Sequence, residues 1–291
     1  MGDQMEEPIV VGRWVTRAIE CGGLHLDGGA MFGSVPRVVW ERCIEPDLEH
    51  RIPLATRLLL LEDTESDRVV IVDAGVGDKE DVSFRERFAV WLPEGSDEPP
   101  LRRAIRKAGV DPDRVTDLII THLHFDHVGG ATTLDAAGHP CMVFPSATHW
   151  IQEANWNSAI DPNPREKASY LRQNIEPLEG TQLKKIDGDG EILSGITVER
   201  VDGHTLGMQT VRVEGGGQVL RYLADLAPTR HHLRPAWTMG YDISAITAVE
   251  EKSRILAQAL EEQAVLVLEH DPESATAKIE LKNGNIVPVL K

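Results

Sequence analysis

Four side chains that can bind a metal ion occur within six positions of one short segment. The segment reads Thr121-His122-Leu123-His124-Phe125-Asp126-His127, and Gly129-Gly130 follow shortly after it. Side chains two residues apart on an extended segment point to the same side, so His122 and His124 can converge on one cation. Because the glycine pair allows a tight turn, Asp126 and His127 can face a second cation. Imidazole and carboxylate ligands suit zinc, with manganese, iron or cobalt as alternatives.

The elements before and after this segment indicate where further ligands would come from. The apolar run Leu118-Ile119-Ile120 directly before it predicts a buried strand. Three more ligand-type residues, His204, Asp225 and His270, also follow apolar runs that predict strands. Since two metal ions need more donors than four neighbouring residues supply, we expect these side chains at one edge of a sheet stack, outside the strand ends.

The complete motif set resembles the metallo-β-lactamase fold superfamily. The resemblance runs over roughly residues 50 to 272, from Asp73-Ala74-Gly75 through the His-x-His-x-Asp-His segment to the three later ligand-type residues. It implies an α/β fold, an αββα sandwich of two mixed sheets flanked by helices. We expect a single hydrolase domain over residues 1–291, in which residues 1–50 supply an N-terminal strand and a pocket-lining loop.

The resemblance also implies which side chains hold the metal ions. The first of two divalent ions is expected on His122, His124 and His204. The second is expected on Asp126, His127 and His270, and Asp225 is implied to bridge both. Asp73 is implied to orient the ligand turn without binding a metal itself. An aspartate at position 225, in place of a cysteine, differs from the pattern of true β-lactamases.

Two metal ions imply a hydrolytic reaction. They would lower the pKa of a bridging water toward 7, and the resulting hydroxide would attack a carbonyl or phosphoryl centre. Such a reaction needs no serine or cysteine nucleophile. Asp126 is the candidate catalytic residue, as a proton shuttle to the leaving group.

The substrate is indicated by three shorter segments. Residues 27–33, 167–171 and 225–233 resemble the branch that holds quorum-quenching N-acyl-homoserine lactonases and related organophosphate hydrolases. We therefore expect a lactonase that opens an N-acyl-homoserine lactone. Pro228 stands where such lactonases often place a tyrosine, and Tyr222 or Tyr241 could replace it as a hydrogen-bond donor, with core packing favoured for Tyr222. The alternatives are a phosphotriester, aryl ester or thioester hydrolase on the same site and, less favoured, a non-catalytic metal-bearing protein.

An acyl chain requires an apolar pocket. We expect its lining to include Met31, Phe32, Trp237, Tyr241 and His232. For His232 the competing interpretation is a structural hydrogen bond.

The amino-acid composition indicates which classes of partner and which cellular compartment to expect. With 41% hydrophobic and 26% charged residues, the 291-residue chain is typical of soluble globular proteins. Its formal net charge of −17 argues against a nucleic-acid partner and an anionic membrane surface. Three scattered cysteines predict reduced thiols and a cytoplasmic location, and the acidic segment Met1–Pro8 shows no secretory signal. The resembled branch makes a homodimer a further expectation.

Periodicity predicts the remaining elements of the chain. Strands are expected at 9–15, 54–62, 68–73, 142–144, 182–186, 196–201, 210–213, 219–223 and 264–268. Helices are expected within 79–92 and at 101–108, 147–155, 166–173 and 246–260. Residues 27–36 are expected to form a loop, and residues 275–290 a hairpin around Asn283-Gly284.

Overall fold

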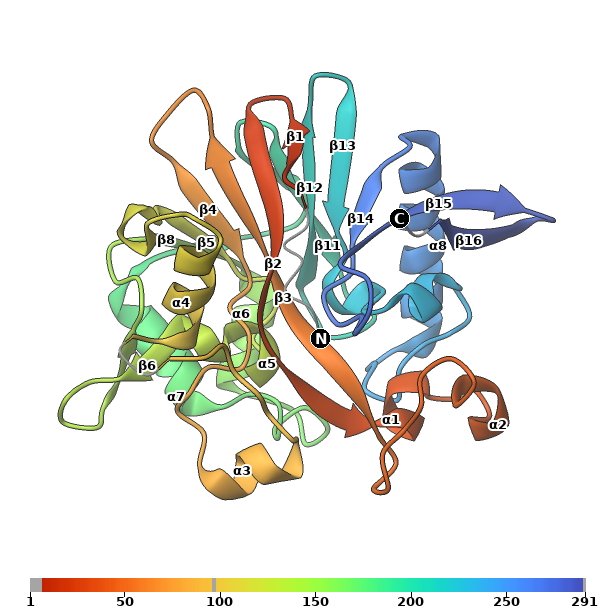
Figure 1. The fold of residues 1–291 in the computed structure, drawn as a ribbon, viewed down its shortest axis with the longest axis horizontal. Helices are drawn as coiled ribbons and strands as arrows, with labels where there is room; N and C mark the ends of the chain where they lie inside the picture. The colour runs from red at the N-terminus through yellow and green to blue at the C-terminus, as the bar shows by residue number, and fades with distance from the viewer. Residues whose placement is uncertain (1–6, 96–97, 290–291) are drawn as a thin grey trace.

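Two seven-stranded sheets pack face to face between helices (Figure 1). The computed structural model describes residues 7–95 and 98–289. The N-terminal residues 1–6 and the end of the predicted terminal hairpin, at residue 290, lie outside this part. Both large sheets are mixed, which confirms the expected αββα class of fold.

The first sheet begins as an antiparallel meander and ends in parallel strands. Strands β1 to β4 pair antiparallel, whereas β4, β5, β8 and β9 pair parallel. Its strands, in spatial order, are β1 (Ile9–Val11), β2 (Trp14–Asp27), β3 (Arg51–Asp63), β4 (Val69–Val72), β5 (Asp117–Ile119), β8 (Thr148–Gln152) and β9 (Gln182–Ile186).

The second sheet contains the C-terminal strands. Its only parallel pair among the described residues joins β13 to β14. Its strands, in spatial order, are β10 (Gly190–Leu193), β11 (Ile196–Val201), β12 (Met208–Gly215), β13 (Gln218–Tyr222), β14 (Val265–Val267), β15 (Thr276–Lys282) and β16 (Asn285–Val289). A small sheet pairs β6 (Thr132–Leu134) with β7 (Pro140–Met142).

Helices cover the sheets and connect the strands. The α-helices are α1 (Gly28–Phe32), α2 (Arg37–Trp40), α3 (Val82–Arg87), α4 (Pro100–Lys107), α5 (Phe125–Val128), α6 (Glu153–Ile160), α7 (Arg172–Ile175) and α8 (Ala245–Glu261). Short 3-10 helices lie at η1 (Pro112–Arg114), η2 (Gly129–Ala131), η3 (Glu176–Gly180), η4 (Ala224–Leu226) and η5 (Arg230–Leu233). None of the described helices combines the length and the apolar character that a membrane crossing requires.

The core explains why the strands of the first sheet read as continuous apolar runs. On β3, Leu59 and Leu61 face the second sheet, while Leu58 and Leu60 face the layer that contains α4. All four side chains are fully buried because both faces of the sheet are covered. Each such burial contributes about 1.5–3 kcal/mol relative to an exposed side chain.

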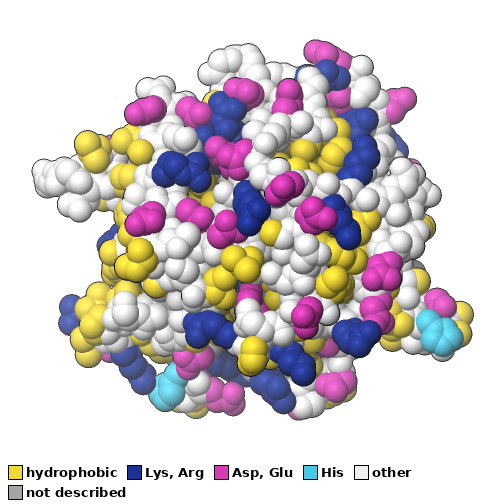
Figure 2. Space-filling model, turned by 180° about the vertical axis from the view of Figure 1, so that it is seen from behind, with side chains coloured by type: hydrophobic (Ala, Val, Ile, Leu, Met, Phe, Trp, Pro, Cys, Tyr) yellow, Lys and Arg dark blue, Asp and Glu magenta, His cyan; other side chains and the backbone are white. Residues whose placement is uncertain are grey.

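The outer surface carries charges of both signs. Figure 2 shows the face behind that of Figure 1, where lysine and arginine side chains lie among aspartates and glutamates, with small apolar areas between them. Among the described residues, many charged side chains form ion pairs, as in the contact of 2.7 Å between Arg13 and Asp63. On this face the acidic excess of the chain is therefore interspersed with cations.

Some expected elements were wrong in type. Residues 147–155, predicted to be helical, begin as strand β8, because parallel pairing with β5 and β9 favours an extended backbone there. Most of the helix expected at 166–173 is replaced by turns, and α7 begins only at Arg172. In the expected loop 27–36, the Asp27 side chain caps the short helix α1 by accepting from the Ala30 N–H.

Two expected strands were misplaced. Residues 9–15 form a hairpin of β1 and β2 because Gly12, with φ of 58°, reverses the chain. The strand expected at 142–144 lies earlier, at β7. By contrast, the terminal hairpin of β15 and β16 forms around Asn283-Gly284 as predicted.

Candidate metal centre

Three histidines from two segments meet at one point. His122 and His124 follow β5, and His204 follows β11. His124 Nδ1 lies 3.0 Å from His122 Nε2 and 3.2 Å from His204 Nε2. All three side chains are buried, so this group of ring nitrogens is shielded from bulk water.

A second group lies beside the first. His127 and Asp126 come from α5, and His270 comes from the end of β14. The Nε2 atoms of the two histidines are 3.3 Å apart. Each carboxylate oxygen of Asp126 lies 3.9 Å from one of these Nε2 atoms, and this side chain is also buried.

Asp225 lies between the two groups. Its Oδ2 is 3.2 Å from His204 Nε2 in the first group and 3.5 Å from His127 Nε2 in the second, and its Oδ1 is 3.3 Å from His270 Nε2. Burial alone would raise the pKa of this carboxyl, but the nearby histidines, His204 first, hold the pKa well below its usual range. An ionised carboxylate at this position can contact a cation in either group.

The outward-facing nitrogens of four histidines each have an oxygen acceptor nearby. His122 Nδ1 lies 3.1 Å from Thr121 Oγ1, His204 Nδ1 lies 2.9 Å from Asp242 Oδ1, and His270 Nδ1 lies 2.7 Å from the Ala55 carbonyl. His127 Nδ1 lies 3.1 Å from Asp73 Oδ2. These acceptors favour the tautomer in which the outward nitrogen carries the proton.

That tautomer leaves unshared electron pairs facing one another. His124 completes the pattern, because its outward Nε2 faces the Glu166 carboxylate at 3.7 Å and its inward Nδ1 then carries no proton. With the outward protons in place, the inward nitrogens approach to 3.0–3.3 Å without a hydrogen between them. Such contacts are repulsive unless a metal ion or a shared proton lies between the nitrogens. The donor set of imidazoles and carboxylates therefore fits divalent metal ions of the zinc class.

Asp73 holds the start of the ligand segment in place through hydrogen bonds from Thr121. Its Oδ1 accepts from the Thr121 N–H at 2.8 Å, and its Oδ2 accepts from the Thr121 hydroxyl at 2.7 Å. Asp73 and Ala224, which precedes Asp225, both have positive φ, at 61° and 46°. Left-handed backbone is uncommon for residues other than glycine, so the fold holds strained residues directly beside the candidate ligands.

The glycine pair has a different function from the one expected. Gly129 adopts ordinary helical angles, with φ of −55° and ψ of −43°, so the turn itself does not need glycine. A Cβ at Gly129 would lie 2.0 Å from the Val76 carbonyl oxygen, and one at Gly130 would lie 2.1 Å from that of Ala74. The pair therefore allows the ligand segment to pack against the loop after β4.

A family model supports the same assignment of the fold. The model of the metallo-beta-lactamase superfamily matches residues 53–270, which include every candidate ligand. The chain belongs to the metallo-beta-lactamase superfamily.

Relatives within this superfamily include lactonases. The N-acyl homoserine lactonase AttM of Rhizobium radiobacter is 28% identical over 180 residues, which cover 58% of this chain and 63% of that protein. An N-acyl homoserine lactonase of Bacillus cereus is 26% identical over 212 residues, covering 70% of this chain and 77% of that protein. The chain thus matches somewhat less than two thirds of the length of AttM.

Solved structures of the superfamily match nearly the whole chain. A probable metal-dependent hydrolase from Staphylococcus aureus superposes with a TM-score of 0.86 at 27% identity, covering 97% of this chain and 99% of that one. AidC, a dizinc quorum-quenching lactonase, superposes with a TM-score of 0.74 at 23% identity, covering 98% of this chain and 96% of that one. At that identity the likeness to AidC shows the fold alone.

The candidate metal centre is nearly closed, and the exposed fractions of its side chains show where its open edge lies. Among the candidate ligands, His124, Asp126 and Asp225 retain 7–9% exposure, whereas the others retain 2% or less. Tyr241 is 37% exposed, and burial together with the carboxylates of Asp126, Asp27 and Asp225 raises its pKa to about 12. Tyr241 is therefore a neutral phenol near this edge.

Three of the residues expected to line the pocket pack as core. Met31 and Phe32 are buried, and the Phe32 ring stacks on that of His232 at 5.0 Å. His232 contacts Thr229 Oγ1 and the Met31 carbonyl, each at 2.8 Å. The structural hydrogen bond is thus the role seen for His232. A pocket lined by these three side chains stays a prediction. Trp237 remains partly exposed and packs edge-on against Phe32 at 5.7 Å.

A group of three aromatic rings packs beside the candidate ligands and was not predicted from the sequence. Phe84 and Phe88, from and just after α3, pack on Phe125 with ring centroids 5.2 and 5.4 Å away. Phe125 lies between two candidate ligands in sequence, and Phe84 and Phe88 are only partly buried. Helical spacing of aromatic residues was visible in the sequence, but nothing in it showed that they would pack against the ligand segment.

The acceptors of the histidines were also missed. Asp242, Glu166 and Glu269 are all buried carboxylates next to candidate ligands. Glu269 precedes His270 in the chain, which was the one local signal available. Asp242 and Glu166 are separated from their histidines by 38 and 42 positions, and no motif connects them.

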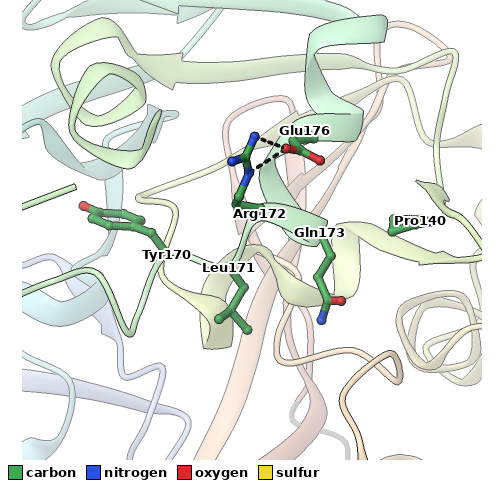
Figure 3. Close-up of a pocket in the computed structure, with 6 residues that line it drawn as sticks. All are labelled: Pro140, Tyr170, Leu171, Arg172, Gln173 and Glu176. Atoms are coloured by element: carbon green, nitrogen blue, oxygen red, sulfur yellow. Dashed lines mark hydrogen bonds and ion pairs between the residues drawn. The ribbon is translucent and has the colours of Figure 1, made fainter. Parts of the chain in front are cut away.

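A separate surface hollow lies on the other side of Tyr170. It has a volume of about 540 Å³ and is lined by Pro140, Tyr170, Leu171, Arg172, Gln173 and Glu176. Figure 3 shows Arg172 paired with Glu176, while the Tyr170 ring is directed away from both. The Tyr170 ring lies 4.9 Å from that of His124, so this side chain contacts a candidate ligand as well as lining the hollow.

Proposed function

We propose that this chain is a metal-dependent hydrolase that holds two divalent metal ions and opens a lactone ring, with an N-acyl-homoserine lactone as substrate. The observation that carries the proposal is the convergence of five histidine nitrogens around Asp225 in two adjacent groups. The lactonase relatives support this substrate class, and the similarity to a probable metal-dependent hydrolase supports the reaction class.

Each metal position would have its own ligand group. His122, His124 and His204 would hold one ion. Asp126, His127 and His270 would hold the other, with Asp225 shared between them. When bound, zinc ions, or manganese, iron or cobalt in their place, would lower the pKa of water and polarise the substrate carbonyl.

The open edge would receive the substrate. The Tyr241 hydroxyl, held neutral near Asp126 and Asp225, can donate a hydrogen bond to the ring or amide oxygen of a lactone. The partly exposed rings of Phe84 and Phe88 offer an apolar surface for an acyl chain. Trp237 is a further candidate for contact with that chain.

Asp126 is proposed to move the proton that the reaction requires. The residue retains 7% exposure, and the contacts of its carboxylate with the ring nitrogens of His127 and His270 are both 3.9 Å. Opening an ester or lactone leaves an alkoxide that must gain a proton. Asp126 can accept a proton from the attacking water and donate it to this oxygen.

Replacing Asp126 with asparagine should therefore separate chemistry from metal binding. At saturating Zn²⁺, where the amide oxygen can still act as a ligand and both positions are filled, we expect Asp126→Asn to lower kcat by about 10²–10⁴-fold, because the amide cannot carry the proton. Metal analysis of the purified variant, together with steady-state kinetics, makes the comparison. Full turnover with both ions present would show that Asp126 is not the shuttle.

The substrate proposal is tested by a side-by-side rate comparison. Metal-loaded protein would be assayed on N-acyl-homoserine lactones of several chain lengths, a paraoxon-type triester, an aryl ester and a thioester. We expect the highest kcat/KM on a lactone. Pro228, in place of the tyrosine often found in lactonases, favours the esters as the second candidate, and a higher kcat/KM on the triester or aryl ester would establish it. Absence of hydrolysis on all four classes would support a non-catalytic metal-binding protein.

Two further proposals concern the state of the protein. The three cysteines, Cys21, Cys43 and Cys141, are free, which supports a reducing compartment such as the cytoplasm. The homodimer implied by the resembled branch is also retained as a proposal. Light scattering at several concentrations measures the oligomeric state.

A further inference from the structure

His127 differs from the other four histidines in having two carboxylates at its outward nitrogen. Its Nδ1 lies 3.1 Å from Asp73 Oδ2 and also 3.1 Å from Glu269 Oε1. Asp73 and Glu269 are fully buried, and neither carboxylate is among the candidate ligands of the two groups described above. Two acidic groups thus share one imidazole N–H.

The two carboxylates are not equivalent. Asp73 accepts the aligned hydrogen bond from His127, and the backbone and hydroxyl of Thr121 also donate to it. Neither oxygen of Glu269 receives a well-aligned hydrogen bond from the described residues. Asp73 is therefore stabilised by local donors, whereas Glu269 is stabilised mainly by the ring of His127.

The position of Glu269 is imposed by the backbone. Its carbonyl accepts from the Arg57 N–H at 3.2 Å, and the next residue, His270, donates its N–H to the Pro228 carbonyl at 3.0 Å. These bonds join the end of β14 to two other segments. The side chain is consequently held beside His127 and cannot swing out to solvent.

A buried carboxylate without hydrogen bonds is costly unless a positive charge compensates it. One place for such a charge is the inward side of His127, where Nε2 faces the second group of candidate ligands. A negative charge behind an imidazole strengthens its inward nitrogen as an electron-pair donor. Glu269 and a cation in the second group would therefore stabilise each other through His127.

We propose that Glu269 is a positioning residue for the second metal position, where it acts through His127 to strengthen binding of that ion. This inference rests on the proposed two-metal centre. The two metal positions would then differ in the carboxylates behind their histidines. In the first group, the outward nitrogen of His204 has the single carboxylate Asp242 as its acceptor. Asp242 thus provides a matched control for the other position.

The test is a titration of Zn²⁺ into metal-free protein, followed by competition with a chelating indicator. For Glu269→Gln we expect the Kd of the second ion to weaken by about 10–100-fold while the Kd of the first stays unchanged. For Asp242→Asn we expect weakening of the first ion instead. Unchanged binding in Glu269→Gln, or equal weakening of both ions, would overturn the inference.

Thermal unfolding separates this function from a merely structural one. For Glu269→Gln we expect the Tm of the metal-free protein to be no lower than wild type and the rise in Tm on adding Zn²⁺ to be smaller. A lower metal-free Tm with an unchanged rise would instead indicate a structural role. If Glu269→Gln does not fold, Glu269→Asp is used: selective weakening of the second ion, as expected when the shorter side chain draws the carboxylate away from His127 Nδ1, supports the inference, and unchanged binding of both ions contradicts it.

The Zn²⁺ titration also distinguishes failure of the function assigned to Glu269 from failure of the proposed two-metal centre. If the wild-type chain binds fewer than two Zn²⁺ ions, the two-metal centre itself fails. If the wild type binds two ions and Glu269→Gln binds them equally well, only the function assigned to Glu269 fails.

Discussion

Replacing Asp225 with alanine is expected to weaken binding of both metal ions and to abolish most hydrolysis. Asp225 is the one candidate ligand whose carboxylate reaches both groups, with contacts of 3.2–3.5 Å to His204, His127 and His270. Its removal leaves three buried imidazoles without their shared anionic neighbour. We expect kcat/KM to fall by more than the 10–100-fold that loss of an outer hydrogen-bond partner typically causes.

Metal content after dialysis and kcat/KM at saturating Zn²⁺ measure this effect. Asp187→Ala is a suitable control because that side chain is 83% exposed and has only a long contact of 3.5 Å with Arg200. The control should retain full metal content and activity, since exposed ion pairs contribute little. Two tightly bound ions in Asp225→Ala would contradict the bridging position proposed for Asp225.

Removing the metal ions with a chelator is expected to lower the thermal unfolding midpoint by more than about 10 °C. Without cations, the inward nitrogens still lie 3.0–3.3 Å apart beside the buried carboxylates Asp225 and Asp126, and the metal ions that would join these groups are gone. An ion present at 1,000 times its Kd stabilises the folded state by about 4 kcal/mol. Each kcal/mol shifts the midpoint by roughly 2–4 °C in a large domain.

Differential scanning calorimetry with and without chelator measures the shift, and added Zn²⁺ should restore the original midpoint. Asp225→Ala serves as the internal reference, since a chain that holds its ions weakly should respond little to the chelator. An unchanged midpoint in wild-type protein would mean that the histidine groups are stable without cations, contrary to the interpretation of their geometry.

The central strands could be predicted because buried strands consist of consecutive apolar residues, which the sequence shows directly. The runs at 69–72 and 118–120 are apolar at every position, which is typical of a strand covered on both faces. The segment 147–155 was mispredicted because its pairing with β5 and β9 is a long-range contact. Local periodicity does not contain that information.

The candidate ligands could likewise be predicted, because His122, His124, Asp126 and His127 are close in sequence and the later three follow apolar strands. Their convergence follows from topology, since β11, β13 and β14 run in the same direction and end at one edge of the second sheet. Loop side chains around this edge could not be placed in the same way. Tyr241 is 37% exposed, whereas Met31 and Phe32 are buried among other apolar side chains.

The sequence alone thus determined the type of chemistry, because the identities and spacing of the metal-binding side chains are local properties of the chain. The tertiary structure decided which hydrogen-bond acceptors and carboxylates lie next to those side chains. The acceptors Asp242 and Asp73 and the second carboxylate Glu269 meet their histidines through contacts between segments distant in sequence. The close packing of Gly129 on Val76 is likewise a contact between backbones. Such contacts depend on how the helices and strands pack, so they cannot be predicted from the spacing of residues in the sequence.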